Sequence, residues 1–249
     1  MDRKRWGRLS YKSKFGWGLA FLAALIFPWI LLTVVGDSVE TDSAQEVEEP
    51  PLVALTFDDG PRRDTTSVLL DGLAERGVHA TFFVVGKQVG GNEDLVRRME
   101  AEGHQVGCHT FDHVKLSGLN DTDFDAQVGR TRRLLSAILG HEGFALRPPY
   151  GFTDEGVERR AGSPVILWSV DPEDWGDKNV ERIVNHVVER AEDGDIILLH
   201  DIYPTSVEAA LEIVDRLHEK GFLFLTVDGL CQAKGLTPGP GQRLRSVKN

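Results

Sequence analysis

Short apolar runs separated by amphipathic stretches recur along most of the chain, and this pattern constrains the fold more than any other feature. Each amphipathic stretch has about ten to fifteen residues and ends at a glycine, which suits a helix terminus that needs a left-handed residue. The glycines are Gly77, Gly103, Gly140, Gly162, Gly194 and Gly221. The expected strands are Leu52–Phe57, Ala80–Val85, Gln105–Cys108, Phe144–Arg147, Val165–Val170, Ile196–Leu199 and Phe222–Val227.

These expected strands alternate very little between apolar and polar residues. Strands that are apolar on both faces and separated by helices indicate an α/β fold, with a parallel sheet covered on both sides. Either an open doubly wound sheet or a closed barrel would fit. The first strand lacks a glycine-rich phosphate loop after it, which disfavours nucleotide binding. Polar clusters directly follow several strands, where parallel barrels keep their sites, so the pattern favours a barrel.

The N-terminal residues have the pattern of a membrane anchor. Residues 1–14 are basic, and the run Phe15–Val35 contains no charged residue. As a helix this run would span roughly 30 Å, the thickness of the apolar core of a bilayer. A cleaved signal peptide is the alternative, although its apolar region usually has only ~7–15 residues. We expect a cytoplasmic segment at 1–14 and a transmembrane helix at 15–36, with the rest of the chain outside the cytoplasm.

The remainder divides into a linker, one domain and a tail. Residues 37–51 are polar and acidic, which is typical of a solvated linker. We place the domain at 52–234 and expect a disordered tail at 235–249, where Pro and Gly precede a basic end. Beyond residue 14, 22 Lys and Arg stand against 38 Asp and Glu. Nucleic-acid binding depends on neutralising phosphates, so we expect no such partner.

Cys108 and Cys231 are the only cysteines. Two are too few for a disulfide scaffold or for a cysteine-based zinc site. Outside the cell they could form a single bridge. Each also lies beside an expected strand, so both could simply be small buried residues.

Carboxylates and imidazoles follow two of the expected strands. Asp58 and Asp59 directly follow the first expected strand. Adjacent like charges are costly unless a cation or a proton compensates them. An Asp-Gly-Pro sequence is also an ordinary turn. His109 and His113 follow the third strand, and on a helical turn they would share one face, about 5–6 Å apart at Cβ. With Asp59 they would offer a metal two nitrogens and one oxygen, leaving positions open for water or substrate.

Three more polar clusters follow later strands, at Arg147–Gly151, Asp171–Trp175 and His200–Asp201. Each by itself could be a loop with a capping carboxylate or a surface charge. Their common position at the carboxyl ends of strands indicates one site. We assign no role to the remaining histidines, which are His79, His104, His141, His186 and His218.

With these motifs the chain resembles the polysaccharide deacetylase family, carbohydrate esterase family 4. The resemblance extends from Leu52 to Leu230, and Ala80–Phe83 adds a further matching stretch. It implies a distorted (β/α)7-8 barrel, here preceded by the transmembrane helix, and a hydrolase that removes N-acetyl groups from a polysaccharide. The family motifs occur in order at Thr56–Pro61, His109–His113, Arg147–Gly151, Asp171–Trp175 and Leu198–His200.

The resemblance also implies a metal centre with a base and an acid. Asp59, His109 and His113 would bind a divalent metal, and their ligand chemistry suits Zn²⁺, with Co²⁺ or Mn²⁺ as possible replacements. Asp58 would be the general base that takes a proton from water. His200 would be the acid that protonates the leaving amine.

Other site residues would support these groups. By the same resemblance, Asp174 would orient the acid and raise its pKa, and Arg147 would pair with the base and keep it ionised. The backbone N–H of Tyr150 would help to hold the oxyanion. Trp175 and Leu198 would form an apolar slot for the acetyl methyl group.

The expected substrate is an N-acetylglucosamine-containing cell-wall polysaccharide, with peptidoglycan favoured. A domain tethered in the cell membrane and facing outward reaches only polymers near the membrane. An O-acetyl esterase acting on a wall glycan is an alternative, because ester cleavage uses the same parts. A non-catalytic glycan-binding module is another, but it would need neither Asp58 nor His200, so their presence favours the enzyme.

Overall fold

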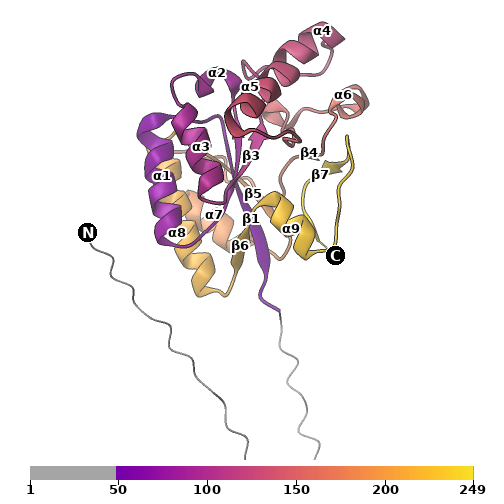
Figure 1. The fold of residues 1–249 in the computed structure, drawn as a ribbon. Helices are drawn as coiled ribbons and strands as arrows, with labels where there is room; N and C mark the ends of the chain where they lie inside the picture. The colour runs from indigo at the N-terminus through magenta and orange to yellow at the C-terminus, as the bar shows by residue number, and fades with distance from the viewer. Residues whose placement is uncertain (1–48, 249) are drawn as a thin grey trace, which may run out of the picture. The chain divides into compact units, whose positions relative to one another are not determined.

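The computed structural model describes residues 49–248 (Figure 1). The strands are β1 (Leu52–Asp58), β2 (Thr81–Val84), β3 (Gln105–Cys108), β4 (Val165–Ile166), β5 (Ile196–His200), β6 (Leu223–Leu225) and β7 (Arg243–Leu244). The α-helices are α1 (Arg63–Glu75), α2 (Gly86–Val89), α3 (Glu93–Ala101), α4 (Asp121–Phe124), α5 (Arg130–Leu139), α6 (Glu155–Arg160), α7 (Val180–Arg190), α8 (Pro204–Glu219) and α9 (Val227–Ala233). A π-helical stretch covers Asp125–Gly129 and a 3-10 turn covers Pro149–Gly151.

A parallel sheet is built around β1, which confirms the predicted α/β class. β2 and β5 pair with β1 in parallel, and β3 continues the sheet beyond β2. β6 pairs with the first residues of β1. The strand predicted at Gln105–Cys108 is observed with the same bounds, and the other strands of this sheet lie within one or two residues of the predicted ends.

Two of the predicted strands are much shorter than expected. Residues 144–147 form only bridges at Leu146, one to Cys108 and one to Val165. The run predicted to continue to Val170 keeps the two residues of β4 and then one bridge from Val170 to Ile197. Pro148 and Pro149 prevent the first segment from extending beyond Arg147, and Pro164 prevents the second from extending backward, since proline cannot donate the backbone hydrogen bond that a ladder needs. These bridges nevertheless carry the pairings from β3 around to β5, and so back to β1.

Side chains of β1 alternate between two apolar cores. Val53, Leu55 and Phe57 face the core that α1, α3, α7 and α8 cover. Figure 1 shows α1, α3 and α8 together beside the sheet. The second core is formed by residues from several of the strands and bridged segments that pair in turn from β1 to β5. It includes Ala54, Phe83, Ala145, Ile166, Ile196 and Leu244. Thr56 and Asp58 lie on the same face of β1 as Ala54, so this face leads from the second core to the polar cluster.

The glycines that end the amphipathic stretches behave as predicted. All six have φ between 63° and 86°, the left-handed region in which glycine is favoured. Gly140, for example, ends α5 with φ of 81° and donates its N–H to the Ser136 carbonyl.

The prediction of a disordered tail is wrong. β7 pairs in parallel with β4, joining Arg243 to Val165 and Leu244 to Ile166. Leu244 and Val247 are buried, and the Val247 N–H donates to the Gly194 carbonyl at 2.7 Å. The tail therefore covers an edge of β4 that would otherwise present unpaired backbone groups.

Two further predictions concern the ends of the chain and its cysteines. The expected transmembrane helix at 15–36, the basic segment 1–14 and most of the 37–51 linker lie outside the described residues. Within residues 49–248, the helices are all too short or too polar to span a bilayer. Cys108 and Cys231 are both buried and unbridged, as expected for small packed residues rather than for a disulfide.

Candidate active site

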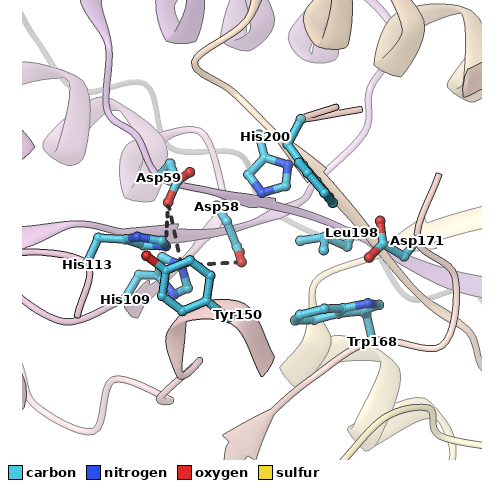
Figure 2. Close-up of a pocket in the computed structure, with 10 residues that line it drawn as sticks. Asp58, Asp59, His109, His113, Tyr150, Trp168, Asp171, Leu198 and His200 are labelled. Carbon is cyan, nitrogen blue, oxygen red and sulfur yellow. Dashed lines mark ion pairs between the residues drawn. The ribbon is translucent and has the colours of Figure 1, made fainter. Parts of the chain in front are cut away.

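The polar clusters converge on one cavity at the carboxyl ends of the strands. The cavity has a volume of about 350 Å³ and includes nearly all the predicted site residues (Figure 2). Arg147 and Asp174 lie behind its wall, where they contact lining residues. The lining residues are Asp58, Asp59, His109, His113, Tyr150, Trp168, Asp171, Trp175, Leu198 and His200.

The loops that form this cavity hold an unusual backbone. Within residues 49–248, the non-glycine residues with positive φ all lie in the predicted motifs, and each such position costs free energy that surrounding contacts must offset. They are Asp59, Thr110, His113, Tyr150 and Glu173. Residues 109–113 form an irregular loop, and not the helical turn on which the two histidines would share one face. The two imidazoles still meet, with ring centroids 5.0 Å apart.

Asp59, His109 and His113 form the candidate metal centre. Asp59 Oδ1 lies 3.3 Å from His113 Nε2 and 3.6 Å from His109 Nε2, and one ligand atom from each residue falls within 4.8 Å of the others. Asp59 Oδ1 is buried and has no hydrogen-bond partner among the described residues. A buried oxygen facing two imidazole nitrogens needs compensating charge, and a metal cation would supply it.

The protonation of both histidines suits metal binding. His109 Nδ1 lies 2.7 Å from the Arg147 carbonyl, so Nδ1 donates its proton there, and in the neutral ring the lone pair for a metal is on Nε2. Burial and the nearby His109 lower the pKa of His113, which favours the neutral ring that a metal requires.

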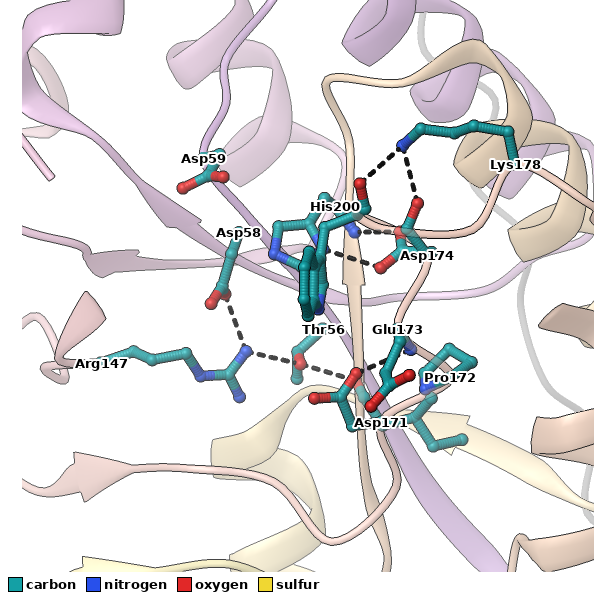
Figure 3. A network of polar contacts seen from close by, with 12 residues as sticks. Thr56, Asp58, Asp59, Arg147, Asp171, Pro172, Glu173, Asp174, Lys178 and His200 are labelled. Carbon is teal, nitrogen blue, oxygen red and sulfur yellow. Dashed lines mark hydrogen bonds and ion pairs between the residues drawn. The ribbon is translucent and has the colours of Figure 1, made fainter. Parts of the chain in front are cut away.

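Arg147 connects Asp58 to the interior of the fold. Its guanidinium is fully buried and donates to Asp58 Oδ1 at 2.8 Å and to Thr56 Oγ1 at 2.8 Å (Figure 3). It also donates to the carbonyls of Ile166 and Leu167. Burial lowers the pKa of Arg147, while the charge of Asp58 opposes that effect. The predicted pairing of these two side chains is thus present, and the other Arg147 hydrogen bonds go to the Thr56 hydroxyl and to two backbone carbonyls.

Asp174 holds His200 at two points. Its carboxylate is fully buried and accepts from His200 Nδ1 at 2.8 Å and from the His200 backbone N–H at 2.9 Å (Figure 3). Burial lowers the pKa of His200, but the hydrogen bond and charge of Asp174, with the charges of Asp58 and Asp59, outweigh it and raise this pKa to about 9. His200 is therefore protonated at neutral pH, with Nε2 free of the Asp174 contact.

The remaining lining combines apolar and acidic side chains. Leu198 is buried at the base of the cavity, and Trp175 is 56% exposed at its rim. The sequence predicted both, but it did not single out Trp168 or give Asp171 a role. Trp168 lies inside a predicted strand, so its place in the cavity depends on the irregular backbone between β4 and Val170. Burial raises the pKa of Asp171.

Known proteins share this sequence and fold. A family model described as polysaccharide deacetylase matches residues 45–163. The peptidoglycan-N-acetylmuramic acid deacetylase PdaC of Bacillus subtilis is 41% identical over 183 residues, which are 74% of this chain and 39% of that protein. A peptidoglycan-N-acetylglucosamine deacetylase of Bacillus cereus is 37% identical over 191 residues, which are 74% of this chain and 89% of that protein. This chain thus spans about two fifths of the first relative and most of the second.

A solved structure extends the comparison to the fold. The family 4 acetyl xylan esterase from Clostridium thermocellum, determined in complex with a cobalt ion, has a TM-score of 0.75 to this chain at 30% identity. The match covers 80% of this chain and all of that one.

Proposed function

We propose that this chain, which belongs to the polysaccharide deacetylase family, removes N-acetyl groups from an N-acetylglucosamine-containing wall polysaccharide with the help of a divalent metal. The observation that carries the proposal is a base and an acid with separate buried partners, Arg147 for Asp58 and Asp174 for His200, beside one candidate metal centre. Hydrolysis needs both groups, whereas binding needs neither. The pairings that return to β1 also support the distorted barrel that the resemblance implies.

The residues of the candidate centre fit a metal. Asp59, His109 and His113 supply two nitrogens and one oxygen, a set that catalytic zinc sites use while keeping a position open. Zn²⁺ suits this set best, and Co²⁺ or Mn²⁺ are alternatives. The chemistry that such a metal supplies when bound is polarisation of the acetamide carbonyl and activation of water.

The chain's own side chains then move the protons. Asp58 accepts the proton of the attacking water through the carboxylate oxygen that Arg147 does not hold. His200 gives a proton from Nε2 to the amine nitrogen as the C–N bond breaks, because an amine leaves poorly unless it is protonated. Asp174 keeps the ring oriented and protonated for this step.

Backbone and apolar groups position the acetyl group. The Tyr150 N–H, on a residue with φ of 63°, is our candidate for a donor to the developing oxyanion. Leu198 and Trp175 are the candidates for contact with the methyl group. Both assignments rest on the resemblance and on the positions of these residues around the cavity.

Product analysis tests the bond that is cleaved. The full chain, loaded with Zn²⁺, would be incubated with purified peptidoglycan, and released acetate and new glycan amino groups would be counted. We expect one amine for each acetate. The similarity to an acetyl xylan esterase favours O-deacetylation as the second candidate, and it would give acetate without amines.

We also propose that the domain faces outward from the cell membrane on a single N-terminal helix. The uncharged run Phe15–Val35 behind a basic flank supports this placement. Protease added to intact spheroplasts should digest the domain, while a cytoplasmic marker survives. A soluble mature protein that begins near Asp37 would favour a cleaved signal peptide instead.

A further inference from the structure

Asp201 lies directly beneath the loop that carries Asp58 and Asp59. Its side chain is buried, although the proposed acid and base chemistry does not use it. The Asp201 backbone N–H donates to the Asp58 carbonyl at 3.4 Å. Its carboxylate lies against Gly60, where a Cβ built on the glycine would lie 2.2 Å from Asp201 Oδ2. Only a glycine at this position leaves room for the carboxylate.

Thr66, in the first turns of α1, connects Asp201 to the far end of the same loop. Its hydroxyl donates to Asp201 Oδ2 at 2.5 Å and accepts from the Arg62 backbone N–H at 2.8 Å. Thr66 is fully buried, so both bonds are shielded from water. The segment between Asp58 and Arg62 is thus held at both ends by one buried pair of residues, through the Asp201 backbone N–H at Asp58 and the Thr66 hydroxyl at Arg62.

This loop needs such support. Asp59 has φ of 75°, a conformation that costs a non-glycine residue free energy and persists only where surrounding contacts determine it. Asp59 also lies next to the carboxylate of Asp58, so their repulsion disfavours any arrangement that brings both into one cavity. The Gly60 carbonyl accepts from the Val85 N–H at 2.9 Å, but that contact belongs to the residue after Asp59 and fixes only one side of the loop.

We propose that Asp201 and Thr66 are positioning residues, which hold Asp59 facing His109 and His113 without contacting metal or substrate themselves. That losing either residue would also lower the rate of deacetylation rests on the proposed function. The consequence for metal binding does not, because it depends only on the geometry of the three candidate ligands. Loss of the pair should therefore weaken metal binding even in a protein whose substrate is unknown.

The test compares a variant of this pair with a matched control elsewhere in the fold. Thr66→Val removes the hydroxyl and preserves the shape of the side chain. Ser169→Ala removes a hydroxyl from a more exposed residue, and this hydroxyl donates to the buried carboxylate of Asp195 at 2.7 Å, at the opposite end of β5 from the site. Co²⁺ would be titrated into the metal-free full chain, with binding followed by visible absorption and folding by thermal unfolding.

We expect Thr66→Val to raise the Kd for Co²⁺ ~10–100-fold, the usual cost of losing a residue that orients metal ligands. Ser169→Ala should also lower the unfolding temperature but leave the Co²⁺ Kd and spectrum unchanged. Parental Co²⁺ binding by a folded Thr66→Val protein would overturn the proposal, as would an equal loss in the control.

A second pair of variants guards against misfolding of the first. Asp201→Asn keeps an oxygen that can accept from Thr66, whereas Asp201→Ala removes it. We expect Asp201→Ala to bind Co²⁺ more weakly than Asp201→Asn. Equal binding by the two would contradict a positioning role. If the parent binds Co²⁺ but releases no acetate from any glycan, the proposed function fails while this inference stands.

Discussion

At the scale of single residues, the assignment of Asp58 and His200 makes a prediction that separates chemistry from binding. Neither side chain belongs to the candidate ligand set, so Asp58→Asn and His200→Ala should both keep bound metal. Each should lose ~10²–10⁴ in turnover, the range typical of acid and base groups. Acetate release and metal content would be measured on the same samples, with His141→Ala, a change on the exposed surface, as the control. Parental turnover in either metal-loaded variant would contradict the roles of base and acid.

The pKa of His200 predicts a pH dependence. This pKa is raised to about 9, so the acid form is present below that pH and is lost as the pH rises through it. Activity should therefore fall on the alkaline side, at or below pH 9 because the charge of a bound metal opposes protonation. Asp174→Asn removes the charge that raises the pKa, so the alkaline limb of the kcat/KM profile should move to lower pH. If the alkaline limb of Asp174→Asn stays at the pH of the parent, a group other than His200 causes the alkaline loss of activity.

The raised pKa of His200 also makes the stability of the fold depend on pH. Because the pKa of His200 in the folded metal-free protein lies above its ordinary value, protonation stabilises the fold fully below about pH 6.5. That contribution is lost as the pH rises through about 9. Urea unfolding of the metal-free parent and of His200→Gln across this window should show a pH-dependent difference between them. A constant difference would contradict the raised pKa.

At the scale of elements, the C-terminal strand makes a prediction about stability. Leu244 is buried between β4 and the second core, so Leu244→Ala should lower the free energy of unfolding by roughly 2 kcal/mol or more. Arg245→Ala changes an exposed neighbour and should have little effect. Urea denaturation of the two variants provides the comparison. Equal, small effects would mean that the tail does not pack against β4 and the second core.

The elements that the sequence predicted best were those with a strong local signal. An uninterrupted apolar run predicted β5, and a terminal glycine predicted the end of α5. β7 has only two residues and forms because β4 offers it an unpaired edge, which local sequence does not reveal. The spacing of His109 and His113 fits a helical turn, but it equally fits the observed loop with left-handed residues at Thr110 and His113.

At the scale of the whole molecule, the site exists only because distant segments meet at one end of the sheet. Motif order in the sequence predicted which loops would converge. It did not predict the support beneath them, such as Thr66 under the Asp59 loop or Trp168 in the cavity wall. Those contacts depend on how α1 and the β4 segment pack, which no short motif encodes.

The most direct test of the central claim couples chemistry to the metal in the intact protein. The full chain would be depleted with a chelator and reloaded stepwise with Zn²⁺, and acetate release from an N-acetylglucosamine oligomer would be measured against bound metal. We predict no release from the depleted chain and a rate that rises in proportion to metal content, up to one ion for each chain. Full release by a chain that holds no metal would contradict the claim, and so would no release by a fully loaded one.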